Sequence, residues 1–410
     1  MCQLTLLRPM VMWPLRDEKV KYFMTMRLYD TAQAAVVDIE LDDHVRMYVC
    51  GITPYDSTHL GHAATYLTYD LIIRRLEDLG HTVQLVRNVT DVDDSILPKA
   101  RELGIDFLEL AETEMNRFSE DMVALNARQA DSEPRATESI KGIVDLIGTL
   151  VTRGHTYTTE GTTYFDVTTF PAFGKLSHLT DQEMVALAAE RGGRPDDPKQ
   201  RNPLDFVLWQ PSANGEPSWD SPYGSGRPGW HIECSAMSMS ALGPALDIHG
   251  GGADLIFPHH ECEIAQSESV SGEPFSKYWV HAGLVAYQGT KMSKSLGNLV
   301  FVSDLRKEID PRAIRLALMA HHYRSGFEWF DDEGPRAQKD LELLVRSAGG
   351  AEPVKVGPLI DQVRNALDDD LDTPRVHQLL LNEAQAIEGG VASASPGCLV
   401  ASASLCGIEL

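Results

Sequence analysis

The 410-residue sequence predicts an α/β fold with a parallel sheet, an insertion that interrupts the sheet and a helical region at the C-terminal end. A strand, a helix and a second strand follow one another within ~45 residues from the first apolar run, which is the order of a βαβ unit and hence of a parallel sheet. Residues 154–176 are rich in Thr, Tyr and Phe and favour short antiparallel strands. From residue 303 onward, apolar residues recur at helical spacing.

Residues 1–45 are predicted to be an N-terminal extension followed by lead-in strands. Arg8, Pro9 and Pro14 interrupt the apolar residues of the first ~25 positions, so we expect neither a signal peptide nor a contribution to the fold there. Residues 27–45 are expected to form a short strand pair that leads into the core.

Residues 46–135 are expected to form the first half of the sheet domain. The apolar run 46–51 predicts a buried strand, and 81–86 predicts the next strand. Between them, apolar residues at helical spacing over 60–79 predict a helix that ends at Gly80, a residue typical of helix ends. Residues 92–128 are acidic and predicted to be helical.

Residues 136–215 are predicted to be a domain inserted into the sheet domain. A helix is expected at 136–153, followed by the antiparallel strands and by a loop at 188–205 that is rich in Gly, Pro and charge. Residues 216–300 should complete the sheet domain and contain a strand at 278–287.

Residues 301–410 are predicted to form a helical domain. Their apolar residues keep a helical period until the last ~20 positions, which are small and apolar without a clear period. We expect those last positions to be a loose tail.

The overall composition excludes several classes of protein. Lys and Arg number 36 and Asp and Glu 60, a net charge of −24, and so acidic a surface repels nucleic-acid backbones. No run approaches the ~18 apolar residues of a membrane helix, so no membrane partner is expected. The six cysteines are scattered without a disulfide framework, which indicates a reducing cytoplasm.

A thiol and two histidines follow the first predicted strand. Cys50 stands at the strand end, and His59 and His62 stand at the start of the helix. In α/β folds, ligands bind where a strand's carboxyl end faces a helix start, because the free N–H groups of the first helical turn attract anions. We interpret the two histidines as phosphate ligands; the alternative is a helix cap with a packed histidine.

The sequence KMSKS at 291–295 is a second candidate phosphate site. Lys291 and Lys294 are flexible cations on a loop flanked by Gly289 and Gly297, and they suit a pyrophosphate whose charge grows as it leaves. The alternative for this motif alone is a solvated surface loop. The sequence HLGH at 59–62, which contains the two histidines, and KMSKS each follow a predicted strand, so a chance occurrence of both motifs is a poor explanation.

Three glycines precede a third candidate, Asp254. Gly250, Gly251 and Gly252 are expected to let the backbone approach a ligand closely. The carboxylate of Asp254 could accept a hydrogen bond from a ribose hydroxyl. The alternative is a tight glycine turn with a capping aspartate.

A fourth candidate is a metal site. Cys50 and Cys234 supply thiols, and His259 and Glu263 stand four residues apart, on one face if that segment is helical. Two cysteines, a histidine and one more ligand make a tetrahedral zinc set. The alternative is that the cysteines are free and buried.

These segments resemble the class I cysteinyl-tRNA synthetase family from residue 46 to residue 375. HLGH resembles its HIGH signature, KMSKS is its second signature intact, and WHIECS and FPHHECEIAQSE resemble its zinc segments. The resemblance implies a class I synthetase Rossmann-like parallel sheet that is split by an insertion and followed by a C-terminal helical bundle. It also implies one Zn²⁺ per chain, bound by Cys50, Cys234 and His259, with Glu263 completing or adjoining the site.

The resemblance further implies an ATP-dependent activation of L-cysteine as the adenylate, assisted by Mg²⁺. His59 and His62 would stabilise the phosphate oxygens, and Lys291 and Lys294 the departing pyrophosphate. The zinc would select the cysteine thiol over the serine hydroxyl. The residues implied to bind substrate or adenylate are Cys50, Gly51, Ile52, Thr53, Thr65, Asn88, Val89, Thr90, Trp230, Gly252, Ala253, Asp254 and Val285.

Within that family, three features favour the mycothiol branch, which joins L-cysteine to the amine of glucosaminyl-inositol. CGITPYD at 50–56 and ERGGRP at 190–195 resemble segments of that branch. Residues 300–410 hold 11 Lys and Arg against 18 Asp and Glu, whereas a domain that grips tRNA should be basic. We therefore expect small-molecule substrates, no nucleic acid and a monomer. The alternatives are a cysteinyl-tRNA synthetase and a non-catalytic paralogue.

Overall fold

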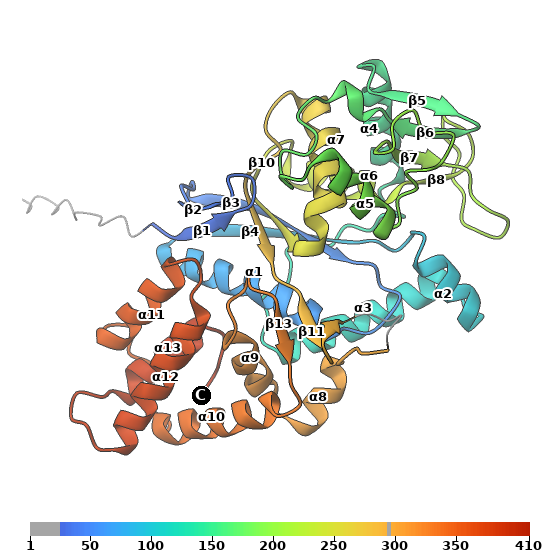
Figure 1. Ribbon diagram of the computed structural model, residues 1–410. Coiled ribbons are helices and arrows are strands. Elements are labelled where there is room, and N and C mark those ends of the chain that lie inside the picture. Colours follow the sequence, from blue (N-terminus) through green and yellow to red (C-terminus); the bar gives the residue numbers. More distant parts are fainter. Residues whose placement is uncertain (1–24, 293–296) are drawn as a thin grey trace, which may run out of the picture.

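The computed structural model describes residues 25–292 and 297–410. Figure 1 shows a central sheet, a small sheet with its own helices on one side of it and a group of C-terminal helices on the other. Within the described residues, no helix combines the length and the apolar character that crossing a bilayer requires.

The central sheet has four parallel strands in the order β10–β9–β3–β4. Their bounds are β3 His44–Ile52, β4 Thr82–Val89, β9 Leu246–Gly252 and β10 Ser276–Ala282. The predicted parallel sheet and its first two strands are therefore confirmed. Because β9 pairs with β3 after a long intervening segment, the two halves of the sheet meet in space although they are far apart in the sequence.

The strand predicted over 278–287 is wrong in one respect, since the chain leaves the central sheet after Ala282. A separate three-stranded sheet contains β11 Val285–Tyr287, β12 Thr290–Lys291 and β13 Phe327–Trp329. At the junction, the Gly283 N–H donates to the Tyr323 carbonyl at 2.6 Å. A Cβ on Gly283 would lie 2.7 Å from the carbonyl carbon of Ser325. This contact with a distant segment accounts for the break.

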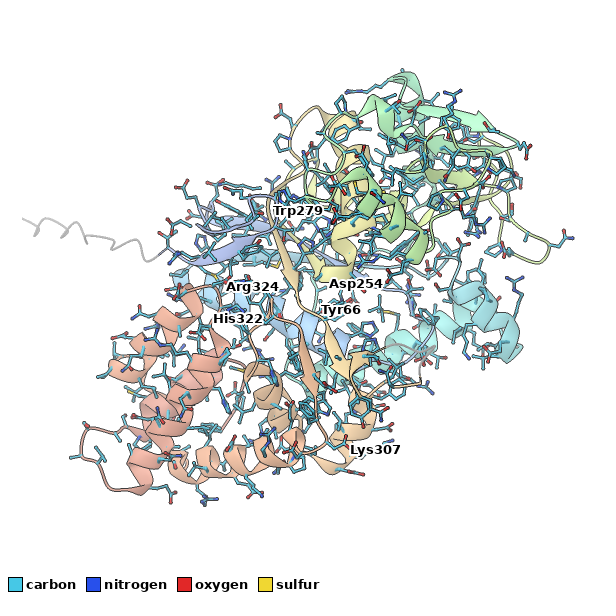
Figure 2. The ribbon with its side chains drawn as sticks, viewed as in Figure 1. Tyr66, Asp254, Trp279, Lys307, His322 and Arg324 are labelled. Carbon is cyan, nitrogen blue, oxygen red and sulfur yellow. The ribbon has the colours of Figure 1, made fainter. Side chains whose placement is uncertain are left out.

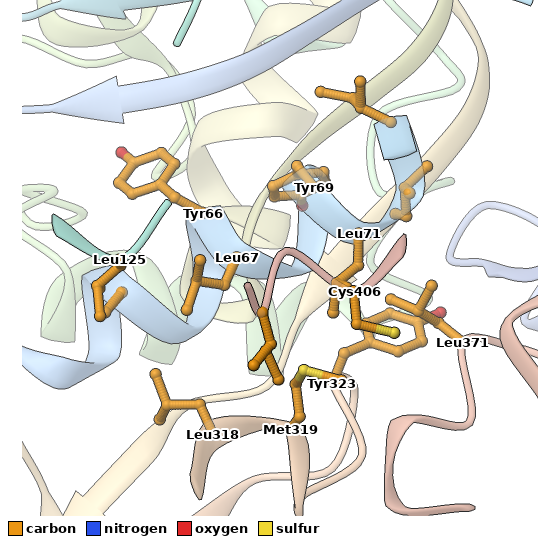
Figure 3. Packing of buried hydrophobic residues seen from close by; sticks show 14 of the residues in the cluster. Tyr66, Leu67, Tyr69, Leu71, Leu125, Leu318, Met319, Tyr323, Leu371 and Cys406 are labelled. Atoms are coloured by element: carbon orange, nitrogen blue, oxygen red, sulfur yellow. The ribbon is translucent and has the colours of Figure 1, made fainter. Parts of the chain in front are cut away.

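Helix α1 (Leu60–Leu79) buries its apolar side chains in a core that it shares with the C-terminal helices. Figure 3 shows Leu67 and Leu71 of this helix close to Leu318 and Met319. The helix ends at Gly80, whose φ of 99° suits glycine, so the predicted helix over 60–79 is confirmed.

Two further segments complete the first half of the sheet domain. The strands β1 (Arg27–Asp30) and β2 (Ala35–Asp38) form the predicted strand pair, which is antiparallel. The acidic region forms two helices, α2 (Ile96–Leu103) and α3 (Phe107–Ala124). They are separated by Gly104, which has a φ of 68° and caps α2.

The insertion contains an antiparallel sheet in the order β5–β6–β7–β8. Its elements are α4 Ile140–Thr152, β5 Thr156–Thr159, β6 Thr162–Phe165, η1 Val167–Thr169, α5 Asp181–Glu190, β7 Phe206–Gln210 and β8 Arg227–Pro228. Residues 191–205 form no helix or strand, in agreement with the sequence. Because β8 pairs with β7, this sheet extends past the predicted boundary at 215.

Helices α6 (Trp230–Leu242) and α7 (Glu261–Ser271) pack the insertion onto the second half of the sheet domain. Ile232 and Ala265 from these helices share a buried cluster with Leu208 and Trp209 of β7. Two short turns, η2 (Ala253–Leu255) and η3 (Ile256–His260), connect β9 to α7.

The C-terminal region is helical except for β13, which the sequence did not predict. Its helices are α8 Val302–Glu308, α9 Pro311–Met319, α10 Glu333–Ala348, α11 Pro358–Asp368, α12 Thr373–Glu388 and α13 Pro396–Leu405.

The predicted loose tail is wrong, because residues 396–405 form helix α13. Cys398, Leu399 and Ala403 of this helix are buried, and so is Ile408 beyond it. A helix that is buried on all sides needs no amphipathic period, so this helix could not be predicted from periodicity.

Candidate active site

A cavity of about 900 Å³ opens at the carboxyl end of the central parallel strands. One of its walls comes from the ends of β3 and β9 and the start of α1, and the other comes from the insertion. Figure 2 labels Tyr66 and Asp254, two lining residues that lie near the centre of the molecule. The predicted site residues that line it are Cys50, Gly51, Ile52, Thr53, His59, His62, Thr65, Trp230, Gly252, Asp254 and Val285.

Gly51 stands where the register of β3 against β4 shifts, between Val49 and Ile52. Its N–H donates to Asn88 Oδ1 at 2.7 Å. A Cβ at this position would lie 1.6 Å from the Asn88 carbonyl oxygen, so only glycine fits. The Asn88 side chain is fixed in turn by donating to Thr90 Oγ1 at 3.0 Å.

Asn88, Val89 and Thr90 are buried behind Gly51. They are not among the described residues that line the cavity, and neither is Ala253. Asn88 thus supports the cavity edge by holding Gly51. The predicted role of these four residues in binding the adenylate stays a prediction.

His59 is the N-cap of α1, and its Nδ1 accepts a hydrogen bond from the Gly61 N–H at 3.1 Å. In the neutral ring the proton is therefore assigned to Nε2, which makes that atom a donor. The His62 ring stacks on His59 with centroids 3.9 Å apart. Burial, with a contribution from His59, lowers the pKa of His62 well below its usual value, so His62 is neutral near pH 7.

The chain that follows KMSKS runs beside the start of α1. The Leu60 N–H donates to the Val300 carbonyl at 2.9 Å, and the Val302 N–H donates to the Thr58 carbonyl at 3.0 Å. Met292 is buried and lines the cavity. Lys294 and the side chain of Lys291 lie outside the described residues, so the role of both lysines stays a prediction.

The glycine run is not the open ligand cradle that we expected. A Cβ on Gly250 would lie 2.3 Å from the Tyr69 ring, and one on Gly251 would meet Leu255. The Tyr69 hydroxyl contacts the Gly251 carbonyl at 2.9 Å and the Val280 carbonyl at 2.7 Å. Two of the glycines therefore make room for protein side chains, and Gly252 is the one that lines the cavity.

Cys50, Cys234, His259 and Glu263 are all buried, and their ligand atoms lie within 4.8 Å of one another. His259 Nε2 lies 2.9 Å from Glu263 Oε1, and Cys50 Sγ lies 3.4 Å from the same oxygen. Trp230 stacks on His259 with centroids 4.3 Å apart and connects this cluster to the cavity. Two thiols, an imidazole and a carboxylate make a donor set suited to zinc.

The charged groups of this cluster shift one another's pKa values. Hydrogen bonding from Cys50, outweighing burial and aided by His259, lowers the pKa of Cys234 to about 6. Burial opposes the charged form of His259, but Glu263 and Cys234 raise the pKa of His259 to about 10. The cluster therefore favours a thiolate at Cys234, which is the form that binds metal.

Three buried histidines that we did not predict from the sequence lie behind the cluster. His249 Nε2 lies 2.8 Å from Glu263 Oε2, and His260 Nε2 lies 3.3 Å from Cys50 Sγ. His281 contacts His260 across 2.7 Å. Cys50, His249, His260 and Glu263 form a second group with metal-ligand spacing. The position of His249 directly before the glycines at a strand end was the available signal.

The comparisons with known proteins agree with this geometry. Residues 36–338 match the family described as tRNA synthetases class I (C) catalytic domain. The chain is 48% identical over 375 residues to the L-cysteine:1D-myo-inositol 2-amino-2-deoxy-alpha-D-glucopyranoside ligase of Thermobispora bispora, covering 91% of this chain and 93% of that one. The chain belongs to this ligase family, within the class I synthetases. The resemblance that the motifs indicated is confirmed.

Another member of the ligase family, from Streptosporangium roseum, is 48% identical over 350 residues and covers 85% of this chain and 86% of its own. Among solved structures, the ligase chain is similar to Mycobacterium tuberculosis methionyl-tRNA synthetase in complex with methionyl-adenylate, with a TM-score of 0.63 and 16% identity. That match covers 88% of this chain and 89% of the synthetase. At this identity it shows the fold alone, and the class I synthetase fold is confirmed.

Proposed function

We propose that this protein is an ATP-dependent ligase that activates L-cysteine as cysteinyl-adenylate and transfers it to the amine of glucosaminyl-inositol, releasing AMP and pyrophosphate. The observation that carries the proposal is the 48% identity to a ligase of that name over 91% of the chain. The cavity at the sheet edge offers a site for both steps.

In the first step, a carboxylate oxygen of cysteine attacks the α-phosphorus of ATP, and pyrophosphate leaves with the electron pair of the broken P–O bond. We assign His59 and His62 to the phosphate oxygens and Lys291 and Lys294 to the pyrophosphate, with Mg²⁺ as the companion of ATP. Donors aimed at developing charge are a large source of catalysis.

In the second step, the acceptor nitrogen forms a C–N bond to the cysteinyl carbonyl carbon. The C–O bond to the phosphate breaks, AMP leaves with its electron pair, and a proton leaves the nitrogen. The amine must be neutral to attack.

We assign the adenylate contacts to three groups of residues. Gly252, Ala253 and Asp254 would hold the adenosine side, with Val285 near the adenine. Trp230 would pack by the cysteine. The remaining assigned residues are Gly51, Ile52, Thr53, Thr65, Asn88, Val89 and Thr90.

We assign one zinc ion to Cys50, Cys234 and His259, with Glu263 completing or adjoining the set. When bound, zinc supplies a site that prefers the cysteine thiol to the serine hydroxyl. Such discrimination needs a specific group, because pocket shape alone separates near-isosteres by only about 1–3 kcal/mol. Trp230, which stacks on His259, would then place the substrate side chain.

We further propose that the enzyme acts as a monomer in the cytoplasm and binds no nucleic acid. The acidic balance of residues 300–410 supports the last point, since a tRNA-binding domain should be basic.

The decisive experiment supplies purified protein with ATP and cysteine, and adds either glucosaminyl-inositol or tRNA. AMP release that depends on the amino sugar, with cysteinyl-glucosaminyl-inositol detected by mass spectrometry, is expected. Transfer to tRNA alone would make the protein a cysteinyl-tRNA synthetase. If zinc-replete protein forms no AMP in the presence of cysteine, the protein is a non-catalytic paralogue.

A further inference from the structure

The proposed reaction needs a second substrate beside the adenylate, and the insertion supplies the unassigned wall of the cavity. Apart from Trp230, the residues assigned to the adenylate that line the cavity come from the sheet edge and the segments that follow its strands. The insertion wall combines polar residues, among them Tyr164, Arg194, Asp197 and Gln200, with apolar ones, among them Phe173 and Leu204. A cavity of about 900 Å³ is near the upper end of the ~300–1,000 Å³ range for ligand sites, which leaves room for more than one ligand group.

Gln200 on this wall has one hydrogen-bonding atom that the protein does not satisfy. Its Nε2 donates to the Asp205 carbonyl at 2.8 Å. That bond fixes the orientation of the amide, and Oε1 is then buried without a hydrogen-bond partner among the described residues. Other buried polar atoms of the described residues are also unpaired, but Gln200 lines the cavity, so a ligand that brings a donor can satisfy its Oε1.

Arg194 is a second residue of this wall that can bind a ligand. Its side chain is exposed, lines the cavity and has no hydrogen bond or ion pair with any described residue. An exposed arginine keeps its donors available to a ligand. It offers donors only, whereas Gln200 Oε1 offers an acceptor. A hydroxyl group both donates and accepts, so a polyhydroxylated ligand can satisfy both residues.

The loop that carries these residues is held in place by a buried carboxylate. Asp205 Oδ2 accepts from the Tyr157 hydroxyl at 2.7 Å and from the Asn202 N–H at 2.8 Å. The Arg201 N–H donates to the same Tyr157 hydroxyl at 2.9 Å. Gln200 is therefore positioned before any ligand arrives, which lowers the entropic cost of binding.

Arg191 joins the insertion wall to the opposite wall. Its Nη1 donates to the carbonyl oxygens of Asp254 and Phe257, on the turn after β9. Gly192, with a φ of 90°, then turns the chain toward Arg194. This contact fixes the distance between the turn that carries Asp254 and the loop that carries Gln200.

We infer that the insertion wall is the subsite for the acceptor, a polyhydroxylated amino sugar, and that Gln200 Oε1 and the Arg194 guanidinium bind its hydroxyl groups. The inference rests on the proposed function and assigns the part of the site that the adenylate does not occupy. Both residues are specificity determinants for the second step and have no part in the first.

The test compares Gln200→Leu and Arg194→Met with Gln182→Leu, a control on the exposed face of α5 that does not line the cavity. Cysteine-dependent ATP–pyrophosphate exchange measures the first step, and the KM for glucosaminyl-inositol measures the second. We expect each site variant to raise that KM about 10-fold or more, the effect of losing one or two hydrogen bonds. Exchange rates and the KM for ATP should stay within about two-fold of wild type, a difference too small to reflect a lost contact.

An unchanged KM for the acceptor in both site variants would overturn the inference. So would a parallel loss of exchange and transfer, because the residues would then support the adenylate site or the fold. If the wild-type protein exchanges pyrophosphate but transfers nothing to glucosaminyl-inositol, the proposed function itself fails, and that result is obtained before any variant is made.

Discussion

His59 performs two jobs that a pair of substitutions can separate. Its Nδ1 caps helix α1 by accepting from the Gly61 N–H at 3.1 Å, and its Nε2 is the proposed donor to the phosphate. The side-chain oxygen of asparagine can take over the cap, whereas alanine cannot. We therefore compare His59→Asn with His59→Ala.

The two effects differ enough in size to be distinguished. Losing an N-cap costs about 1 kcal/mol of stability. Losing a donor to developing charge costs roughly 2.7–4 kcal/mol, or about 10²–10³ in rate. We expect His59→Asn to keep wild-type stability but to lose about 10²-fold or more in activity. His59→Ala should lose the same activity and about 1 kcal/mol of stability as well.

The assays are cysteine-dependent ATP–pyrophosphate exchange for activity and urea unfolding for stability. Exchange at the wild-type rate in His59→Asn would refute the reasoning and leave His59 as a helix cap alone. Equal stability of the two variants would show instead that the hydrogen bond to Gly61 contributes little to the fold.

Three further predictions concern other parts of the molecule. Cys50→Ala should lose about one equivalent of zinc together with cysteine activation; zinc retained in that variant, measured by mass spectrometry, would remove Cys50 from the ligand set. Arg315 and Asp70 form a buried ion pair, so Arg315→Met should lower the free energy of unfolding by about 3–5 kcal/mol, and a change below about 1 kcal/mol in urea would contradict this. Burial, against the pull of Arg306, raises the pKa of Asp121 to about 6; because the native state then binds this proton more tightly than the unfolded chain, stability should fall as the pH rises through the window from about 4 to 6. Asp121→Asn removes that loss, so unfolding experiments should find the variant more stable relative to wild type at about pH 7.5 than at about pH 4.5.

Local signals in the sequence predicted the central sheet well. The helix over 60–79 has a clear apolar period and a glycine at its end, and both features act within a few residues. The break of the strand at Gly283 depends on contact with Ser325, which no local pattern reveals. Helix α13 was missed because it is buried on all sides and therefore lacks the amphipathic period on which the prediction relied.

In the candidate site, too, motifs in the sequence identified some residues, whereas residues that meet only through contacts between distant segments were missed. Cys50, Cys234 and His259 were identified by resemblance, and the structure brings them together. His249 and His260 were missed because their proximity to Cys50 depends on β9 lying next to β3, an order that the sequence did not specify. Gly250 was assigned to the ligand, but it faces Tyr69, whose position on α1 could not be inferred from the glycine run.

The contact made by Arg191 bears on whether the insertion can be moved from one member of the ligase family to another. Its partners on the turn after β9 are backbone carbonyl oxygens, not side chains. Any residues that keep the backbone of that turn can therefore accept the arginine. The insertion also shares a buried cluster with α6 and α7, and Glu261 of α7 accepts from the Leu176 and Ser177 N–H groups. We therefore expect the insertion to be transplantable between members of the family only together with Arg191 and these two helices, while the ends of β3 and α1 that face the nucleotide stay unchanged.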